Sequence, residues 1–75
     1  MIEIVDVERF PITLAQFIKW RGLAITGGEA KEIIKTGLVK VNGERCIIPG
    51  KKLATGDEII VSTEEGDLIY KVRGD

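Results

Sequence analysis

A chain of 75 residues can form only one small domain, whose core lies near the lower size limit for folding alone. It contains no histidine and one cysteine, Cys46, which excludes an internal disulfide, a cysteine-based zinc site and any nucleophile activated by histidine. The single serine, Ser62, does not stand in a Gly-x-Ser-x-Gly sequence. We therefore expect residues 1–75 to form one domain, and not an enzyme. We also expect no metal and no cofactor.

No apolar run approaches the roughly 20 residues that cross a bilayer, and the first residues do not follow the pattern of a secretory leader. We therefore expect a cytoplasmic protein that does not contact a membrane. The net charge of −1 argues against a polyanion partner, but the charge is unevenly distributed. From Leu14 to Thr55, eight basic residues stand against three acidic ones, a net charge of +5, whereas both ends are acidic. This split indicates a polyanion partner for the basic part.

The first half of the chain predicts one strand and two helices. Residues 2–7 alternate apolar and acidic positions, as a strand does. Thr13 to Gln16 has the capping-box pattern that begins a helix, and Thr26 to Glu29 repeats it. Gly22 and Gly37 are typical of the residues at which helices end.

The second half predicts strands. Residues 38–41 lead into Asn42-Gly43, the sequence most typical of a two-residue hairpin turn, and a return strand is expected at about residues 45–48. Pro49-Gly50 is interpreted as a type II turn.

Two further strands are predicted at about residues 58–62 and 68–72. Because the helices are grouped rather than alternating with strands, the order predicts an α+β fold. We expect two short helices in the N-terminal half, packed on a small and mainly antiparallel sheet, with flanking strands at both ends.

Basic side chains recur in the predicted helix and hairpin. Lys31 and Lys35 are spaced i, i+4, which places them on one ridge of the second helix. Lys40 and Arg45 would face each other across the hairpin, where like charges are mildly destabilising. A phosphate between them would explain their presence; the alternative is a different register, or screening by Glu44.

Two other segments are candidates for phosphate contacts. Thr26-Gly27-Gly28 places open backbone N–H groups at a helix N-terminus, where an anion can bind. The alternative is that Thr26 only caps its own helix. Lys51-Lys52 either extends the basic surface or is a solvated turn. Trp20 could stack on a base, although partial burial against the sheet is the alternative.

Apolar residues, glycines and charges recur at characteristic spacings across residues 12–61: Leu14, Phe17, Gly22-Leu23, Glu29-Ala30-Lys31, Ile34, Gly37, Val39-Lys40-Val41-Asn42-Gly43 and Gly56-Asp57. This pattern resembles the S4-type RNA-binding domain, and in particular short bacterial proteins that consist of this domain alone. The resemblance implies a compact S4-like fold, the αL motif, whose helices and hairpin present basic residues to structured RNA.

The resemblance also implies a function and a surface. The function is non-catalytic binding of ribosomal or transfer RNA, with the ribosome or a ribosomal subunit as a setting. Combined with the basic residues noted above, it predicts this set of RNA contacts: Thr26, Gly27, Gly28, Lys31, Lys35, Lys40, Arg45, Lys51 and Lys52.

The chain departs from the family at two places. Many members have Ser-Arg where Thr26-Gly27 stands, and the short bacterial group often has arginines where Ile47, Ile48 and Pro49 stand. Fewer guanidinium groups predict a lower affinity for phosphate. An alternative function is a protein-interaction module that keeps the fold and binds a partner through its acidic ends or through strand edges at 2–7 and 68–72.

Overall fold

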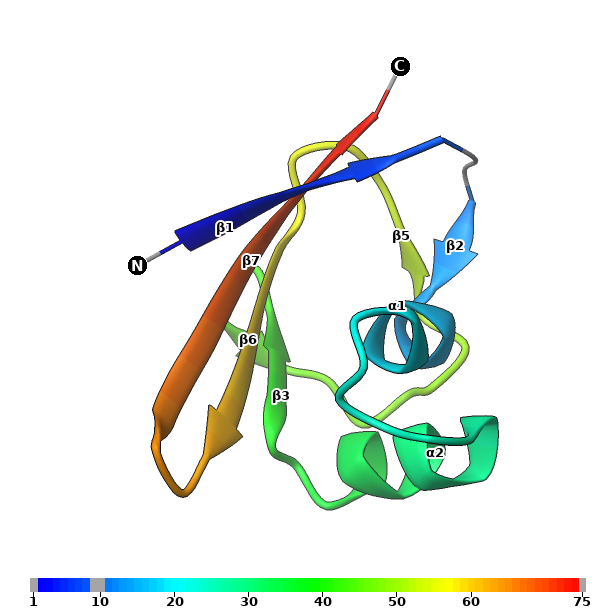
Figure 1. The fold of residues 1–75 in the computed structure, drawn as a ribbon, viewed down its shortest axis with the longest axis vertical. Helices are drawn as coiled ribbons and strands as arrows, with labels where there is room; N and C mark the ends of the chain where they lie inside the picture. Colours follow the sequence, from blue (N-terminus) through cyan, green and yellow to red (C-terminus); the bar gives the residue numbers. More distant parts are fainter. Residues whose placement is uncertain (1, 9–10, 75) are drawn as a thin grey trace.

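The computed structural model describes residues 2–8 and 11–74, which form two helices and seven strands (Figure 1). Their bounds are β1 (Ile2–Val7), β2 (Ile12–Thr13), α1 (Leu14–Trp20), α2 (Gly27–Lys35), β3 (Val39–Val41), β4 (Glu44–Arg45), β5 (Lys52–Leu53), β6 (Glu58–Thr63) and β7 (Gly66–Gly74). Five strands form one sheet in the order β1-β7-β6-β3-β4, and β2 and β5 form a separate antiparallel pair. Within the large sheet only β1 and β7 run parallel. The predicted α+β class, with a mainly antiparallel sheet, is confirmed.

Both helices cover the same face of the large sheet (Figure 1). The core fills the space between these two layers. Its largest fully buried side chains are Phe17, Leu14, Ile18, Ile34, Ile59, Val39 and Val72. The ring of Phe17 meets that of Tyr70 edge-on, with 5.5 Å between the centroids, so α1 and β7 pack directly against each other.

The two helix starts follow the sequence pattern to different degrees. At α1 the capping box is complete: Thr13 Oγ1 accepts from the N–H of Gln16, and Gln16 Oε1 accepts from the N–H of Thr13. At α2, Thr26 Oγ1 accepts from the N–H of Glu29 at 3.1 Å, but the described residues show no return bond from the Glu29 side chain. Of the two bonds of the capping box predicted at α2, the structure therefore shows only the one accepted by Thr26. Gly37, with φ +85°, ends α2 as predicted.

The hairpin between β3 and β4 has the predicted turn and register. Asn42 and Gly43 both have positive φ, 53° and 85°, as a type I′ turn requires. Lys40 is paired with Arg45 across the two strands, which confirms the expected register. The return strand is shorter than the predicted 45–48, because the chain leaves the sheet after Cys46 bonds to Val39.

Residues 46–51 leave the sheet to reach the N-terminus of α1. The first N–H groups of a helix have no acceptor within it. Here the N–H groups of Leu14 and Ala15 donate to the carbonyls of Lys51 and Pro49, at 2.8 and 3.0 Å. The turn at Pro49-Gly50 is closed by a bond from Lys51 N–H to Ile48 O, but Gly50 lacks the positive φ of a type II turn, so that prediction is wrong.

The prediction that residues 68–72 form an edge strand is also wrong. The strand expected at 68–72 is part of β7, which lies between β1 and β6 and exposes no edge. The edges of the large sheet are β1 and β4. In the described part of the chain, neither helix has the length and apolar character that a membrane span needs.

Candidate nucleic-acid interface

The β3–β4 hairpin lies against the end of α2 through one side chain. A methyl group at Gly37 would come within 3.2 Å of Arg45 Cδ and 3.4 Å of Arg45 Nε. Arg45 therefore crosses the backbone just after α2, two residues beyond Lys35, the last residue of the helix. The negative end of the helix dipole favours a cation at this position. Lys40, exposed on the neighbouring strand, is paired with Arg45 across the hairpin.

The other end of α2 carries two glycines that the fold does not require. A Cβ at Gly27 would meet nothing within 4 Å, and one at Gly28 would meet only Thr26 Oγ1 at 3.9 Å. Neither glycine has a positive φ. Their N–H groups lie in the first turn, where no intrahelical acceptor exists. The helix therefore begins with a bare, open backbone, and Gly27 shares a ridge with Lys31 and Lys35 at i, i+4 spacing.

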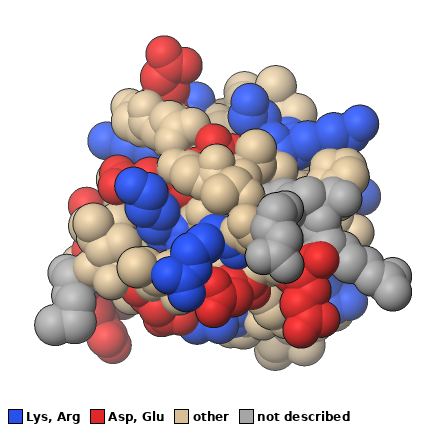
Figure 2. Space-filling model, turned by 90° about the horizontal axis from the view of Figure 1, so that it is seen from above, with Lys and Arg blue, Asp and Glu red and all other residues tan. Residues whose placement is uncertain are grey.

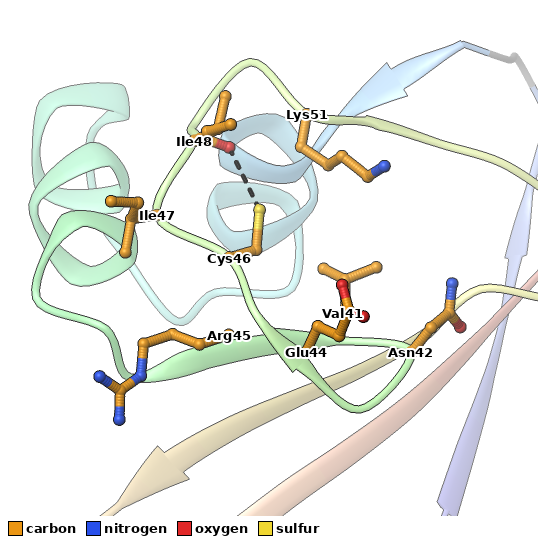
Figure 3. Close-up of a pocket in the computed structure, with 8 residues that line it drawn as sticks. All are labelled: Val41, Asn42, Glu44, Arg45, Cys46, Ile47, Ile48 and Lys51. Atoms are coloured by element: carbon orange, nitrogen blue, oxygen red, sulfur yellow. Dashed lines mark hydrogen bonds between the residues drawn. The ribbon is translucent and has the colours of Figure 1, made fainter.

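A hollow of about 450 Å³ separates the hairpin from residues 46–51 (Figure 3). Glu44 and Lys51 extend toward it from these two segments, and Ile47 and Ile48 form part of its wall. The thiol of Cys46 lies inside it, 3.7 Å from the carbonyl oxygen of Ile48.

The hollow separates the two lysines of the predicted turn. Lys51 lines it together with Arg45, so these two cations, six residues apart in the chain, lie around one depression. Lys52 belongs to β5, where it is paired with Thr13, and does not line the hollow. The structure thus gathers Lys51 with the hairpin but places Lys52 on the small second sheet.

Hydrogen bonds join the Val41-Asn42-Gly43 motif to the Gly56-Asp57 motif and the residue that follows it. Asn42 Nδ2 donates to Asp57 Oδ1 at 3.0 Å, and Asn42 Oδ1 accepts from the N–H of Glu58 at 2.9 Å. Asp57 Oδ2 also accepts from the N–H of Ala54 at 2.8 Å. The two motifs therefore fix the hairpin to the start of β6. The bonds of Asn42 and Asp57 are therefore structural.

Comparison with known families and structures gives the family. Residues 5–69 match the model of the S4 domain family. The chain belongs to the S4 domain family. Its fold is similar to the solution structure of the C-terminal domain of a tyrosyl-tRNA synthetase, with a TM-score of 0.67 and 22% identity over 100% of this chain and 79% of that one. No sequence among curated proteins matches significantly.

S4 domains are in general non-catalytic RNA-binding modules, and this chain is an RNA-binding domain of that family. Its fold, with two helices on a mixed sheet, is S4-like. Within residues 2–8 and 11–74, no group of three or more His, Cys, Asp or Glu side chains is placed to hold a metal ion.

One basic residue of the S4 domain is held by other residues of the chain. Arg21, at the end of α1, forms an ion pair with Glu3 of β1, and its guanidinium lies 5.6 Å from the ring centroid of Tyr70. The net charge of +5 over residues 14–55 therefore overstates the positive charge that is free to meet a polyanion. The sequence offered no local signal of this pair, because Glu3 lies 18 residues before Arg21.

Trp20 does not join the basic surface of the S4 domain. Its side chain is 53% exposed and lines a hollow with Asp6, Glu8 and other residues near β1. Figure 2, a view onto the upper end of Figure 1, shows acidic and basic side chains intermixed on that face. Near β1, Arg73 Nε donates to Asp6 Oδ1 at 2.7 Å, and this bond lowers the pKa of Asp6 and raises that of Arg73.

Proposed function

We propose that this S4 domain binds structured RNA of the ribosomal or transfer RNA class, without catalysis, in the bacterial cytoplasm and in association with a ribosome or ribosomal subunit. The binding site is a basic surface that we call the α2–hairpin surface. It consists of Thr26, Gly27, Gly28, Lys31, Lys35, Lys40, Arg45, Lys51 and Lys52. The similar solved domain belongs to a tyrosyl-tRNA synthetase, which supports transfer RNA as one of the two classes.

The contact between Arg45 and Gly37 carries the proposal, because it joins the helix and the hairpin into one basic surface. Lys31 and Lys35 lead along α2 toward this contact, and Lys40 stands beyond it across the hairpin. Two like charges directly opposite each other are mildly destabilising unless an anion lies between them. A phosphate of the RNA backbone supplies that anion at Lys40 and Arg45.

The open N-terminus of α2 extends the surface at its other end. Two glycines in a helix cost roughly 0.5–1 kcal/mol each relative to alanine, and neither is required by packing here. Close approach of a phosphate to the N–H groups of Gly27 and Gly28 accounts for both glycines.

The mechanism is positioning by phosphate contacts. Such contacts fix the orientation of the domain on RNA but do not read its sequence, so selectivity follows from RNA shape. Five or six contacts predict that log K falls with log salt concentration at a slope of roughly −3 to −5. The affinity is modest, because Thr26-Gly27 and residues 47–49 lack the arginines found in many relatives.

The test is a binding assay of the full chain with ribosomal and transfer RNA over a series of salt concentrations. The double change Lys31→Glu and Lys35→Glu is expected to abolish RNA retention at low salt without altering the circular dichroism spectrum. The matched control is Lys19→Glu with Lys71→Glu, which changes the net charge equally at exposed lysines outside the surface. Absence of binding at low salt, or a flat salt dependence, contradicts the proposal.

A second candidate function is protein binding along the free edge of β1. This strand ends the large sheet, and its Ile2 and Ile4 side chains are 50% and 55% exposed. An unpaired edge can accept an added strand from a partner. This alternative predicts that the Lys31→Glu and Lys35→Glu pair leaves capture of the protein partner unchanged.

A further inference from the structure

The hollow beside the hairpin interrupts the α2–hairpin surface between two of its cations, Arg45 and Lys51. Its volume of about 450 Å³ lies within the roughly 300–1,000 Å³ typical of sites for small molecules. A backbone held by cations on both sides would pass over its opening. A depression at this place can therefore receive one nucleotide that projects from the bound strand.

An acidic side chain enters the hollow although the surface around it is basic. Glu44 and Lys51 reach toward the space from opposite walls in Figure 3, and no ion pair joins them in the described part of the chain. A carboxylate next to a phosphate-binding surface opposes binding of the backbone. It becomes favourable when it accepts hydrogen bonds from the N–H groups of a base.

The remaining walls suit the faces of a base. Val41, Cys46 and Ile48 line the space between the two charged groups, and Ile48 is 62% exposed. Unpaired bases in RNA are bound by contact with their flat faces together with hydrogen bonds to their edges. The hollow offers both kinds of contact at once.

We propose that the hollow binds an unpaired guanine that projects from the RNA on the α2–hairpin surface; this inference rests on the proposed function. Guanine presents two neighbouring N–H donors, at N1 and N2, which match the two oxygens of the Glu44 carboxylate. Its O6 and N7 are acceptors, which suit the ammonium group of Lys51.

The experiment uses the full chain and a set of RNA hairpins with one stem and a single bulged G, A, C or U, with a fully paired stem as reference. Affinities are measured at one low salt concentration. The wild-type protein is expected to bind the bulged G roughly ten-fold more tightly than the other three. Glu44→Gln is expected to reduce this preference to about two-fold or less while leaving affinity for the paired stem unchanged or slightly raised.

Glu64→Gln is the matched control, because it removes the same charge from an exposed residue in the turn between β6 and β7 that does not line the hollow. Equal affinity of the wild type for the four bulges overturns the inference, as does a preference that survives Glu44→Gln or is lost equally in Glu64→Gln. In each of these cases binding of the paired stem still supports the proposed function. Failure to bind any of the RNAs at low salt overturns both.

Cys46 supplies a second measurement, since it is the only cysteine of the chain and lines the hollow. A guanine in the hollow covers its thiol. Alkylation of Cys46 is therefore expected to slow more with the bulged G hairpin than with the paired stem, both at saturating concentration. Equal protection by the two RNAs overturns the placement of the base.

Discussion

Arg45 lies across the backbone of Gly37, so the β3–β4 hairpin meets α2 at the residue where the helix ends. A Cβ at Gly37 would require the Arg45 side chain to shift by a few tenths of an ångström, and the φ of +85° is also unfavourable for any residue with a Cβ. It places Arg45 beside the C-terminal end of α2, the helix that carries Lys31 and Lys35. This one contact therefore serves both the packing of the fold and the proposed surface.

Gly37→Ala tests that contact. We expect a loss of roughly 1–2 kcal/mol in the free energy of unfolding, because alanine must adopt a left-handed conformation and must also displace Arg45. Urea unfolding of both proteins measures the difference. Gly50→Ala is the control: Gly50 has no positive φ and no neighbour within 4 Å, so its replacement is expected to be neutral or slightly stabilising. Equal losses in the two variants would contradict this account.

Replacement of the two glycines that begin α2 should affect stability and RNA binding in opposite directions. Changing Gly27 and Gly28 together to alanine is expected to stabilise the fold by about 0.4–1 kcal/mol per site, because both sites are open and helical. The same change is expected to weaken RNA binding, because the new methyl groups hinder approach to the backbone N–H groups. Thermal unfolding and filter binding measure the two effects. Unchanged RNA affinity would remove these glycines from the surface.

The hydrogen bonds of Asn42 and Asp57 should contribute to the stability of the fold. Asn42→Gly preserves the positive φ and removes the side-chain bonds, so we expect a loss of about 0.5–1.5 kcal/mol. Asp57→Ala is expected to cost less in the Asn42→Gly protein than in the wild type, because one bond is shared. A double-mutant cycle by urea unfolding measures the coupling. Strict additivity of the two losses would show that the bond contributes nothing.

Arg21 should matter for folding and not for RNA. Its ion pair with Glu3 and its position over Tyr70 predict that Arg21→Ala destabilises the protein by about 1–2 kcal/mol. The slope of RNA affinity against salt concentration should not change, because this guanidinium already has a partner. Lys19→Ala, at an exposed site on the same helix, is the control for both measurements. A smaller salt slope in the Arg21 variant would place Arg21 on the RNA.

The ion pair of Asp6 and Arg73 predicts that the stability of the fold depends on pH in the acidic range. Its hydrogen bond and charge lower the pKa of Asp6 below the ordinary value of 3.8. A lowered carboxyl pKa stabilises the fold above the unfolded-state pKa, and this contribution is lost as pH falls through the folded-state pKa. The free energy of unfolding of the Asp6→Asn variant should therefore fall less steeply below about pH 4 than that of the wild type. Identical pH profiles from pH 6 to pH 2 would exclude a contribution from this pair.

Much of the local structure could be predicted, because it depends on residues close together in the chain. The strand at residues 2–7 and the helix starts at Thr13 and Thr26 follow from patterns within a few positions. The pairing of Lys40 with Arg45 follows from the Asn-Gly turn alone, since a two-residue loop allows one register. The family resemblance, carried by spacing across residues 12–61, also agrees with the match over residues 5–69.

The tertiary structure decided which of these elements meet. Asp6 and Arg73 are 67 positions apart, and the parallel pairing of β1 with β7 that unites them turned an expected edge strand into an inner one. The placement of Arg21 on Glu3, of Arg45 on Gly37 and of Lys51 beside the hairpin likewise depends on packing. Residue spacing specifies turns and caps because they close within one local segment. Distant partners are chosen only when the apolar faces of strands and helices are buried together, and this packing determines which cations remain free for RNA.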